Sequence, residues 1–287
     1  MDVLMGLIAA VCWGVTDYLV SLNGRALGVQ RSVFYSQFIG LIILSSFMVI
    51  SSSGLHVLFE ASLETILVCI IAAMLTFIGA ICLTKALSQG RTSVVAPLIT
   101  SYGMVTTILA WFGGELLTGI QVLGIAICML GIWLVGVGHG KTVSRANQYE
   151  GRAIIYALLA AGLYGCSFWV QGKYALKAVG PINMLWLTYF LGVVFLLFAL
   201  RKGEDFYKIN IKACGTLSAA SVFNLGGFAA FALGALEGSV AIVTVISTLS
   251  GGVAAVLGYF FYKERLVIGQ LSGVLLVILG AVVLHAF

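Results

Sequence analysis

The chain has 287 residues, of which 61% are apolar and 9% are charged, and its formal net charge is +5. Soluble globular proteins have about 45–50% apolar and about 25% charged residues, so this composition indicates an integral membrane protein and excludes an ordinary soluble domain. The small positive charge follows from the distribution of basic residues in the loops, and it requires no nucleic-acid partner.

Ten apolar runs of about 20 residues follow one another along the chain, the length that crosses a hydrocarbon core of about 30 Å. The runs are continuously apolar, whereas barrel strands alternate, so helices are favoured. The predicted fold is an all-α integral membrane protein with ten transmembrane helices. These spans are 3–22, 33–51, 63–84, 92–112, 118–138, 152–172, 181–200, 212–235, 239–261 and 267–286. No basic segment precedes the first run, so we expect it to remain as a span.

The first span contains the segment WGVTDYLV, in which Trp13, Thr16 and Asp17 share one helix face. Asp17 is the only acid well within a span. An uncompensated carboxylate there would cost at least about 2.5–3.5 kcal/mol, so we expect it to be protonated, paired or hydrated. Two roles stay open, proton coupling in a transport cycle and a structural ion pair with Arg25 or Lys85.

Polar stripes recur in later spans. In the sixth span Tyr164, Ser167 and Gln171 repeat the spacing of the first, and an aromatic residue above a hydroxyl suits a cavity wall that binds a small organic molecule. The alternative is that these hydroxyls bond to their own helices and the small residues let helices pack. The remaining predicted substrate-binding residues are Thr100 and Tyr102 in the fourth span, Asn224 in the eighth, and Ser247 and Thr248 in the ninth.

Catalytic and metal-binding motifs are absent from the sequence. The six cysteines are scattered singly, and His56, His139 and His285 lie far apart at span ends. No HExxH, GxSxG or phosphate-binding GxxxxGK[ST] pattern occurs. We therefore predict no catalytic residue, no metal and no cofactor.

The segment KERLVIGQLSG at 263–273 matches GELLTGIQVLG at 114–124, with Glu, Leu, Gln and Gly in one register. This match predicts two five-helix repeats, 1–143 and 144–287. Because five is odd, the second repeat must enter the membrane from the opposite side. Glu264 is expected to cap or neutralise the start of the tenth span.

Loop charges agree with this inversion. Two of the 15 basic residues, Lys173 and Lys177, fall on one side, and positive-inside reasoning puts the other side in the cytoplasm and both termini outside. A multi-pass location in the plasma (inner) membrane is expected. The basic residues on the predicted cytoplasmic side are Arg25, Arg31, Lys85, Arg91, Lys141, Arg145, Arg152, Arg201, Lys202, Lys208, Lys212, Lys263 and Arg265.

Two five-span halves, each with an Ala-Leu pair ending its third span, resemble the EamA-type members of the drug/metabolite transporter superfamily. This resemblance implies a secondary carrier for small metabolites, with a central cavity between the halves and alternating access. The family's proline in the fourth span has Ile246 as its counterpart, so a kink in the ninth is expected at Gly251 and Gly252. Family members often keep their termini in the cytoplasm, the reverse of the charge prediction. The residues that carry the resemblance are Ala86, Leu87, Pro97, Glu115, Leu117, Gln121, Gly124, Ala235, Leu236, Glu264, Leu266, Gln270 and Gly273.

The leading hypothesis is a secondary active transporter that exports a small-molecule substrate such as an amino acid or related compound, embedded in a lipid bilayer as a monomer or homodimer. A flippase for a lipid-linked or amphipathic substrate is the alternative within transport. An intramembrane enzyme ranks last, because no histidine lies within a span interior to act as a base. A purely structural assembly protein would not need Asp17 and paired polar stripes.

Overall fold

Helices make up almost all of the regular structure in the computed structural model, which describes residues 2–50, 56–114, 118–137, 145–200, 211–237, 240–264 and 268–283. In these ranges, seven helical segments of at least 18 residues are apolar enough to cross a membrane, and three shorter apolar segments lie within the remaining predicted spans. The all-α prediction is confirmed. The predicted boundary between the repeats, 143/144, lies outside the described residues.

The helices match the ten predicted spans in order. They are α1 (Asp2–Leu27), α2 (Val29–Ile50), α4 (Leu63–Gln89), α5 (Thr92–Ile99) with α6 (Tyr102–Phe112), α7 (Gly119–Val137), α8 (Arg145–Val170) with η1 (Gln171–Ala175) and α9 (Leu176–Val179), α10 (Pro181–Leu200), α11 (Ile211–Glu237), α12 (Val240–Ser247) with α13 (Ser250–Tyr262), and α14 (Ile268–Val283). The short α3 (His56–Glu60) lies between the second and third spans.

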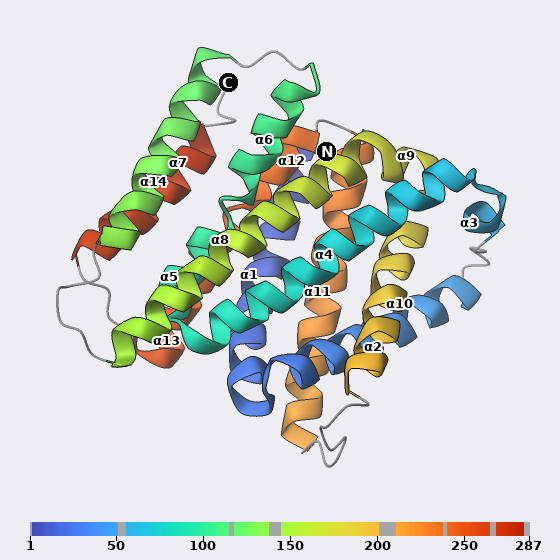
Figure 1. Ribbon diagram of the computed structural model, residues 1–287, viewed down its shortest axis with the longest axis horizontal. Coiled ribbons are helices and arrows are strands. Elements are labelled where there is room, and N and C mark those ends of the chain that lie inside the picture. The colour runs from blue at the N-terminus through green and yellow to red at the C-terminus, as the bar shows by residue number, and fades with distance from the viewer. Residues whose placement is uncertain are drawn as a thin grey trace.

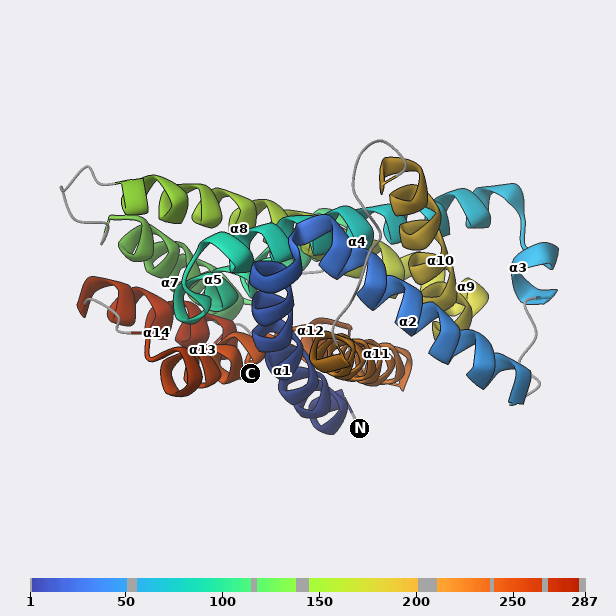
Figure 2. The same ribbon diagram turned by 90° about the horizontal axis from the view of Figure 1, so that it is seen from below.

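Helix pairing follows a pseudo-twofold pattern between the halves. The first span packs along the eighth, α1 against α11, and the third packs along the sixth, α4 against α8. Two further pairs each join equivalent spans of the two halves: α2 packs against α10, and α7 packs against α14. These two pairs lie on opposite sides of the molecule (Figures 1 and 2). Exchange of the two halves maps this set of pairs onto itself, as two inverted five-helix repeats require.

Equivalent glycines show the same symmetry at the level of atoms. Gly14 of α1 faces Val253 of α13, where an added Cβ would lie 2.5 Å from the valine Cβ. Gly165 of α8 faces Val105 of α6 in the same way, also at 2.5 Å. Only glycine allows these helices to approach so closely, and the matching contacts occur once in each repeat-to-repeat crossing.

Arg25 of the first half and Glu264 of the second meet at one end of the bundle. An Arg25 guanidinium nitrogen donates to the Gly90 carbonyl at 2.7 Å and lies 3.5 Å from a carboxylate oxygen of Glu264. Lys173 lies at the other end, where it donates to the Gly113 carbonyl at 3.1 Å. We refer to the end marked by Arg25 as the basic end. The predicted loop cations Lys141, Arg201, Lys202, Lys208 and Arg265 lie outside the described residues.

The expected role of Glu264 is corrected by the structure. Among the described residues, its carboxylate caps the start of α5, in the other repeat, and not that of α14: it accepts the backbone N–H groups of Thr92 at 3.0 Å and Ser93 at 2.8 Å. The Ser93 hydroxyl also donates to it at 2.7 Å. The unpaired N–H groups at a helix start attract a carboxylate. Because Glu264 belongs to the second repeat and α5 to the first, these hydrogen bonds join the two repeats at the basic end.

The fourth and ninth spans are both broken helices. The first break falls at Thr100 and Ser101, whose hydroxyls donate to the Pro97 and Leu98 carbonyls at 2.7 Å each. The second break falls at 248–249, before the glycines expected to cause it. Gly251 instead lies against Pro97 where α13 crosses α5. The Ser247 hydroxyl likewise donates to the Thr244 carbonyl. At both breaks, side-chain hydroxyls therefore compete with backbone N–H groups for the helix carbonyls.

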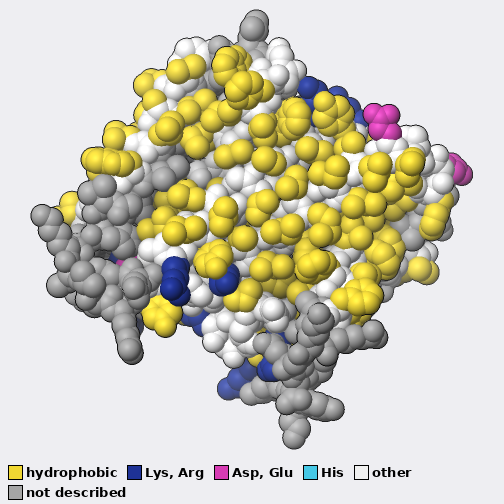
Figure 3. Space-filling model, in the orientation of Figure 1, with side chains coloured by type: hydrophobic (Ala, Val, Ile, Leu, Met, Phe, Trp, Pro, Cys, Tyr) yellow, Lys and Arg dark blue, Asp and Glu magenta, His cyan; other side chains and the backbone are white. Residues whose placement is uncertain are grey.

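The outer surface is apolar over most of its area. Figure 3 shows hydrophobic side chains across the visible face, with Lys and Arg gathered near its lower edge and its upper right. Large side chains such as Ile50 and Phe59 are more than four-fifths exposed. Such a surface is stable in a lipid bilayer and would aggregate in water.

Candidate substrate cavity

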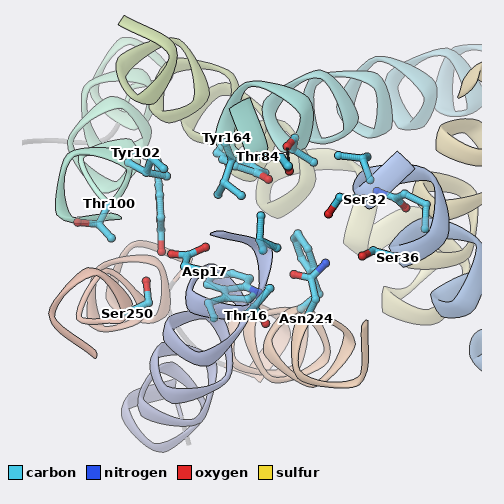
Figure 4. A pocket seen from close by; sticks show the side chains of 18 of the residues that line it. Thr16, Asp17, Ser32, Ser36, Thr84, Thr100, Tyr102, Tyr164, Asn224 and Ser250 are labelled. Atoms are coloured by element: carbon cyan, nitrogen blue, oxygen red, sulfur yellow. Dashed lines mark hydrogen bonds between the residues drawn. The ribbon is translucent and has the colours of Figure 1, made fainter. Parts of the chain in front are cut away.

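A cavity lies at the centre of the bundle, between the two repeats (Figure 4). Helices α1, α2, α4, α5 and α6 border it from the first repeat, and α8, α11 and α13 from the second. It encloses about 710 Å³ of empty space, including its open mouth. The part of this space that the centre of a water-sized molecule can reach is only about 80 Å³, so the cavity is narrow in this conformation, while its position between the repeats suits a small ligand.

Most of the predicted substrate-binding residues meet in this cavity. The polar stripe of α1 and the aromatic residue of the α8 stripe converge on it from opposite repeats. The predicted residues that line it are Trp13, Thr16, Asp17, Thr100, Tyr102, Tyr164 and Asn224. The four predicted residues that do not line it are Ser167, Gln171, Ser247 and Thr248.

Asp17 projects into the cavity without a neutralising partner. Its residue is 6% exposed, and no hydrogen bond or ion pair to its carboxylate exists among the described residues. In Figure 4 it extends from α1 toward the hydroxyl end of Tyr102 and toward Ser250. At the matched position of the α8 stripe stands Phe168, so the acid belongs to one repeat alone. A buried carboxylate without a partner is costly, which makes Asp17 a candidate functional residue.

The alternative structural ion pair for Asp17 is contradicted. Arg25 is engaged by Glu264 and by the carbonyls of Leu87 and Gly90, at the basic end. The Lys85 ammonium lies 4.4 Å from the centre of the Tyr156 ring. Neither cation reaches Asp17, which leaves the carboxylate to face the cavity.

The threonines and the asparagine of the cavity wall are anchored by their own hydrogen bonds. The hydroxyls of Thr16, Thr84 and Thr100 donate to carbonyls of their own helices at 2.7–2.8 Å. The Asn224 amide nitrogen donates to the Tyr189 hydroxyl at 2.9 Å. The alternative interpretation of the polar stripes was that their hydroxyls donate to the backbone of their own helices. These threonine hydroxyls do so. Their oxygen atoms still border the cavity.

Ser167 and Gln171 serve the contact between α8 and α4 instead. The Ser167 hydroxyl lies 2.6 Å from the Thr76 hydroxyl and donates to the Ala72 carbonyl at 2.7 Å. The Gln171 amide nitrogen donates to Thr76 and Ser167 at 3.1 and 2.9 Å. All three side chains are buried. They form a buried hydrogen-bond network between α4 and α8, outside the cavity lining.

Ser247 and Thr248 lie beside the break in the ninth span. The Ser247 hydroxyl is 2.9 Å from the Tyr102 hydroxyl, so Ser247 orients a ring that does line the cavity. Thr248 is buried at the break itself. These two residues therefore lie next to the cavity wall without lining the cavity.

Four aromatic rings pack against one another beside the cavity, and three of them, Trp13, Phe168 and Phe228, line it. Trp13 stacks on Phe168 at 5.5 Å and meets the edge of Phe228 at 5.1 Å. Phe231 lies 4.7 Å from Phe168. Trp13 lies four residues, about 6 Å, before Asp17 on α1, on the side away from Arg25, because one residue advances the helix by about 1.5 Å. The cluster of Trp13, Phe168, Phe228 and Phe231 is called the aromatic plug below.

Sequence reasoning missed the contribution of α2. Ser32, Ser36 and Gln37 line the cavity at positions i, i+4 and i+5, which share one helix face. Three polar side chains close together in the first half of a largely apolar helix were the available signal. Thr84 and Ser250 were missed as well, although Ser250 matches Ser101 across the repeat.

These features define a polytopic α-helical membrane protein of the transporter class, with inverted repeats around a central cavity. The chain belongs to the EamA-like transporter family, whose model matches residues 1–137 and 151–285. The family belongs to the drug/metabolite transporter superfamily, and both repeats of the predicted resemblance are confirmed.

A curated relative from Archaeoglobus fulgidus, described as an uncharacterized transporter, is 23% identical and matches 99% of this chain and 98% of its own length. A solved structure described as "Crystal structure of protein" superposes with a TM-score of 0.71 at 15% identity, covering 98% of this chain and 95% of that one. The second comparison shows a shared fold. The family and the relative indicate transport rather than catalysis.

Proposed function

We propose that the protein is a secondary active transporter that exports a small metabolite, such as an amino acid or related compound, through the cavity between its repeats. The observation that carries this proposal is one unpaired carboxylate, Asp17, in a cavity that both repeats border. Binding sites at the interface of inverted repeats, beside broken helices, are typical of secondary carriers. The breaks at 100–101 and 248–249 lie beside this cavity.

Alternating access is supported by the unequal ends of the cavity. Trp13 of the aromatic plug lies before Asp17 on α1, away from the basic end. Val20, Ser32 and Thr84 extend the cavity wall toward the basic end. The positive-inside rule assigns the basic end to the cytoplasm. This conformation then corresponds to loading from the cytoplasm, and rocking of the repeats about the site would open the plug for release outside.

Proton coupling at Asp17 is the second part of the proposal. A carboxylate with no ion-pair partner gains a proton readily when the cavity is dry and loses it when the cavity opens to water, because burial disfavours the charged form. Proton release and uptake on opposite sides would bias the direction of rocking. The result would be exchange of protons against substrate.

The test uses proteoliposomes that hold a pH-sensitive dye and are loaded with the common amino acids and their decarboxylated amines. An imposed pH gradient should drive solute efflux with matching proton entry in the wild type. Asp17→Asn should abolish coupled proton movement. The matched control is Glu64→Gln, which changes an exposed carboxylate outside the cavity and should retain it. Undiminished coupling in Asp17→Asn would refute the proton-coupling role.

A further inference from the structure

We propose that the cavity recognises a primary ammonium group, which binds the Asp17 carboxylate, and that it discriminates against substrates whose charge is a carboxylate. This inference rests on the proposed transport function and names the substrate class for the same cavity. It comes from the charges and from the hydrogen-bonding capacity of the wall.

The charge inventory of the wall favours a cation. Among the described residues that line the cavity, Asp17 alone carries a formal charge, and Lys, Arg and His are absent from that lining. Arg25 of α1 and Lys85 of α4, two helices that border the cavity, contact Glu264 and the Tyr156 ring instead. A carboxylate ligand would therefore meet a like charge and find no counter-charge, whereas an ammonium would find its ion-pair partner.

The hydrogen-bonding inventory has the same bias. Thr16, Thr84 and Thr100 spend their hydroxyl hydrogens on backbone carbonyls, so they offer the cavity only oxygen lone pairs. Asn224 likewise spends an amide hydrogen on Tyr189, and its oxygen has no partner among the described residues. A primary ammonium has three donors and no acceptor, which complements such a wall.

One buried acceptor strengthens this bias, and one buried donor opposes it. The Gln37 side-chain oxygen, on the cavity wall, is fully buried and has no hydrogen-bond partner among the described residues. The Trp13 indole N–H is likewise buried without a partner, but it belongs to the aromatic plug. Serine and tyrosine hydroxyls of the wall serve either role. The Gln37 amide nitrogen and the second amide hydrogen of Asn224 remain as donors, so the bias toward acceptors comes from the three threonines and the two unpartnered amide oxygens.

Aromatic rings complete the fit. Tyr102, toward which Asp17 extends in Figure 4, lines the cavity together with Tyr164, Trp13 and Phe168. Ring faces attract a cation electrostatically and also pack against the apolar body of an amine. A zwitterionic amino acid satisfies the same carboxylate with its ammonium but leaves its own carboxylate without a cation. The expected order of affinity is therefore amine, then amino acid, then acid.

Four probes that share a phenyl group test this order on the purified full-length protein by calorimetric titration: 2-phenylethylamine, phenylalanine, 2-phenylethanol and 3-phenylpropionate. We expect the amine to bind at least about tenfold more tightly than the acid, because its ion pair with Asp17 is desolvated. Asp17→Asn should remove that advantage, so that the amine binds no more tightly than 2-phenylethanol, and retained binding of 2-phenylethanol shows that the variant is folded. Gln37→Leu should weaken the amine more than the alcohol.

Equal or tighter binding of 3-phenylpropionate would overturn the inference, as would unaltered amine binding in Asp17→Asn or no binding by any probe. Glu64→Gln is the matched carboxylate control and should bind like the wild type. Proteoliposomes separate this inference from the function on which it rests. Efflux of acids but not amines refutes the ammonium site alone, whereas efflux of no tested compound refutes transport.

Discussion

Replacing Glu264 with alanine should loosen the basic end of the bundle and lower the free energy of unfolding. The carboxylate is 9% exposed and accepts three hydrogen bonds from Thr92 and Ser93 at the start of α5. Without it, two backbone N–H groups lose their partners, at about 1–3 kcal/mol each. The ion pair with Arg25, whose side chain is 34% exposed, adds at most about 1 kcal/mol. Because water reaches this end, we expect a total loss of about 2–4 kcal/mol.

Unfolding titrations with SDS in mixed micelles measure this loss. The matched control is Glu150→Ala, which removes an ion pair with Arg91 near the same end, where the two side chains are 19% and 29% exposed. Its cost should stay below about 1 kcal/mol because solvent screens the pair. Glu264→Gln keeps one acceptor oxygen and should fall between the two. A loss in Glu264→Ala no greater than that in Glu150→Ala would show that the carboxylate does not fasten the repeats.

Three further predictions concern helix packing, the off-cavity network and orientation. Gly14→Ala should lower the free energy of unfolding by about 1–3 kcal/mol because the added methyl group meets Val253. Gly162→Ala, where the methyl group would enter open space, should cause no such loss, and SDS titration measures both variants. Gln171→Leu should cost about 1–2 kcal/mol in unfolding but leave binding of 2-phenylethylamine unchanged, since Gln171 lies outside the cavity. A reporter enzyme fused after Phe287 should be active on the non-cytoplasmic side of the membrane, and cytoplasmic activity would contradict the charge-based orientation.

The fold could be predicted from the sequence because its main determinants are local or repeated. Continuous apolar runs specify helices in lipid, where every backbone group must bond within its own segment. The shared Glu, Leu, Gln and Gly of 114–124 and 263–273 indicated the repeat, and the differing charges of these segments indicated its inversion. Both features survive in the structure as the pseudo-symmetric pairs of helices.

The site was only partly predictable because polar residues on one face of a helix do not indicate whether that face contacts the cavity or another helix. The stripe of α8 divides, with Tyr164 at the cavity and Ser167 and Gln171 against α4, since their partner Thr76 stands there. Glu264 was assigned to the nearest helix start in sequence, yet it caps α5, which is remote in sequence and adjacent in space. Such choices depend on how the two repeats interlock, which no single span contains.

The measurement that tests the central claim most directly is the accessibility of Thr16→Cys, at mid-cavity, in a chain whose own six cysteines are replaced. Oriented proteoliposomes are treated with a membrane-impermeant maleimide from one side at a time. Alternating access through this cavity predicts labelling from the basic end at rest, and labelling from the opposite side that quickens when 2-phenylethylamine is supplied. Labelling from one side only, at a rate that the amine does not change, would show that the cavity is a closed pocket and contradict the transport mechanism.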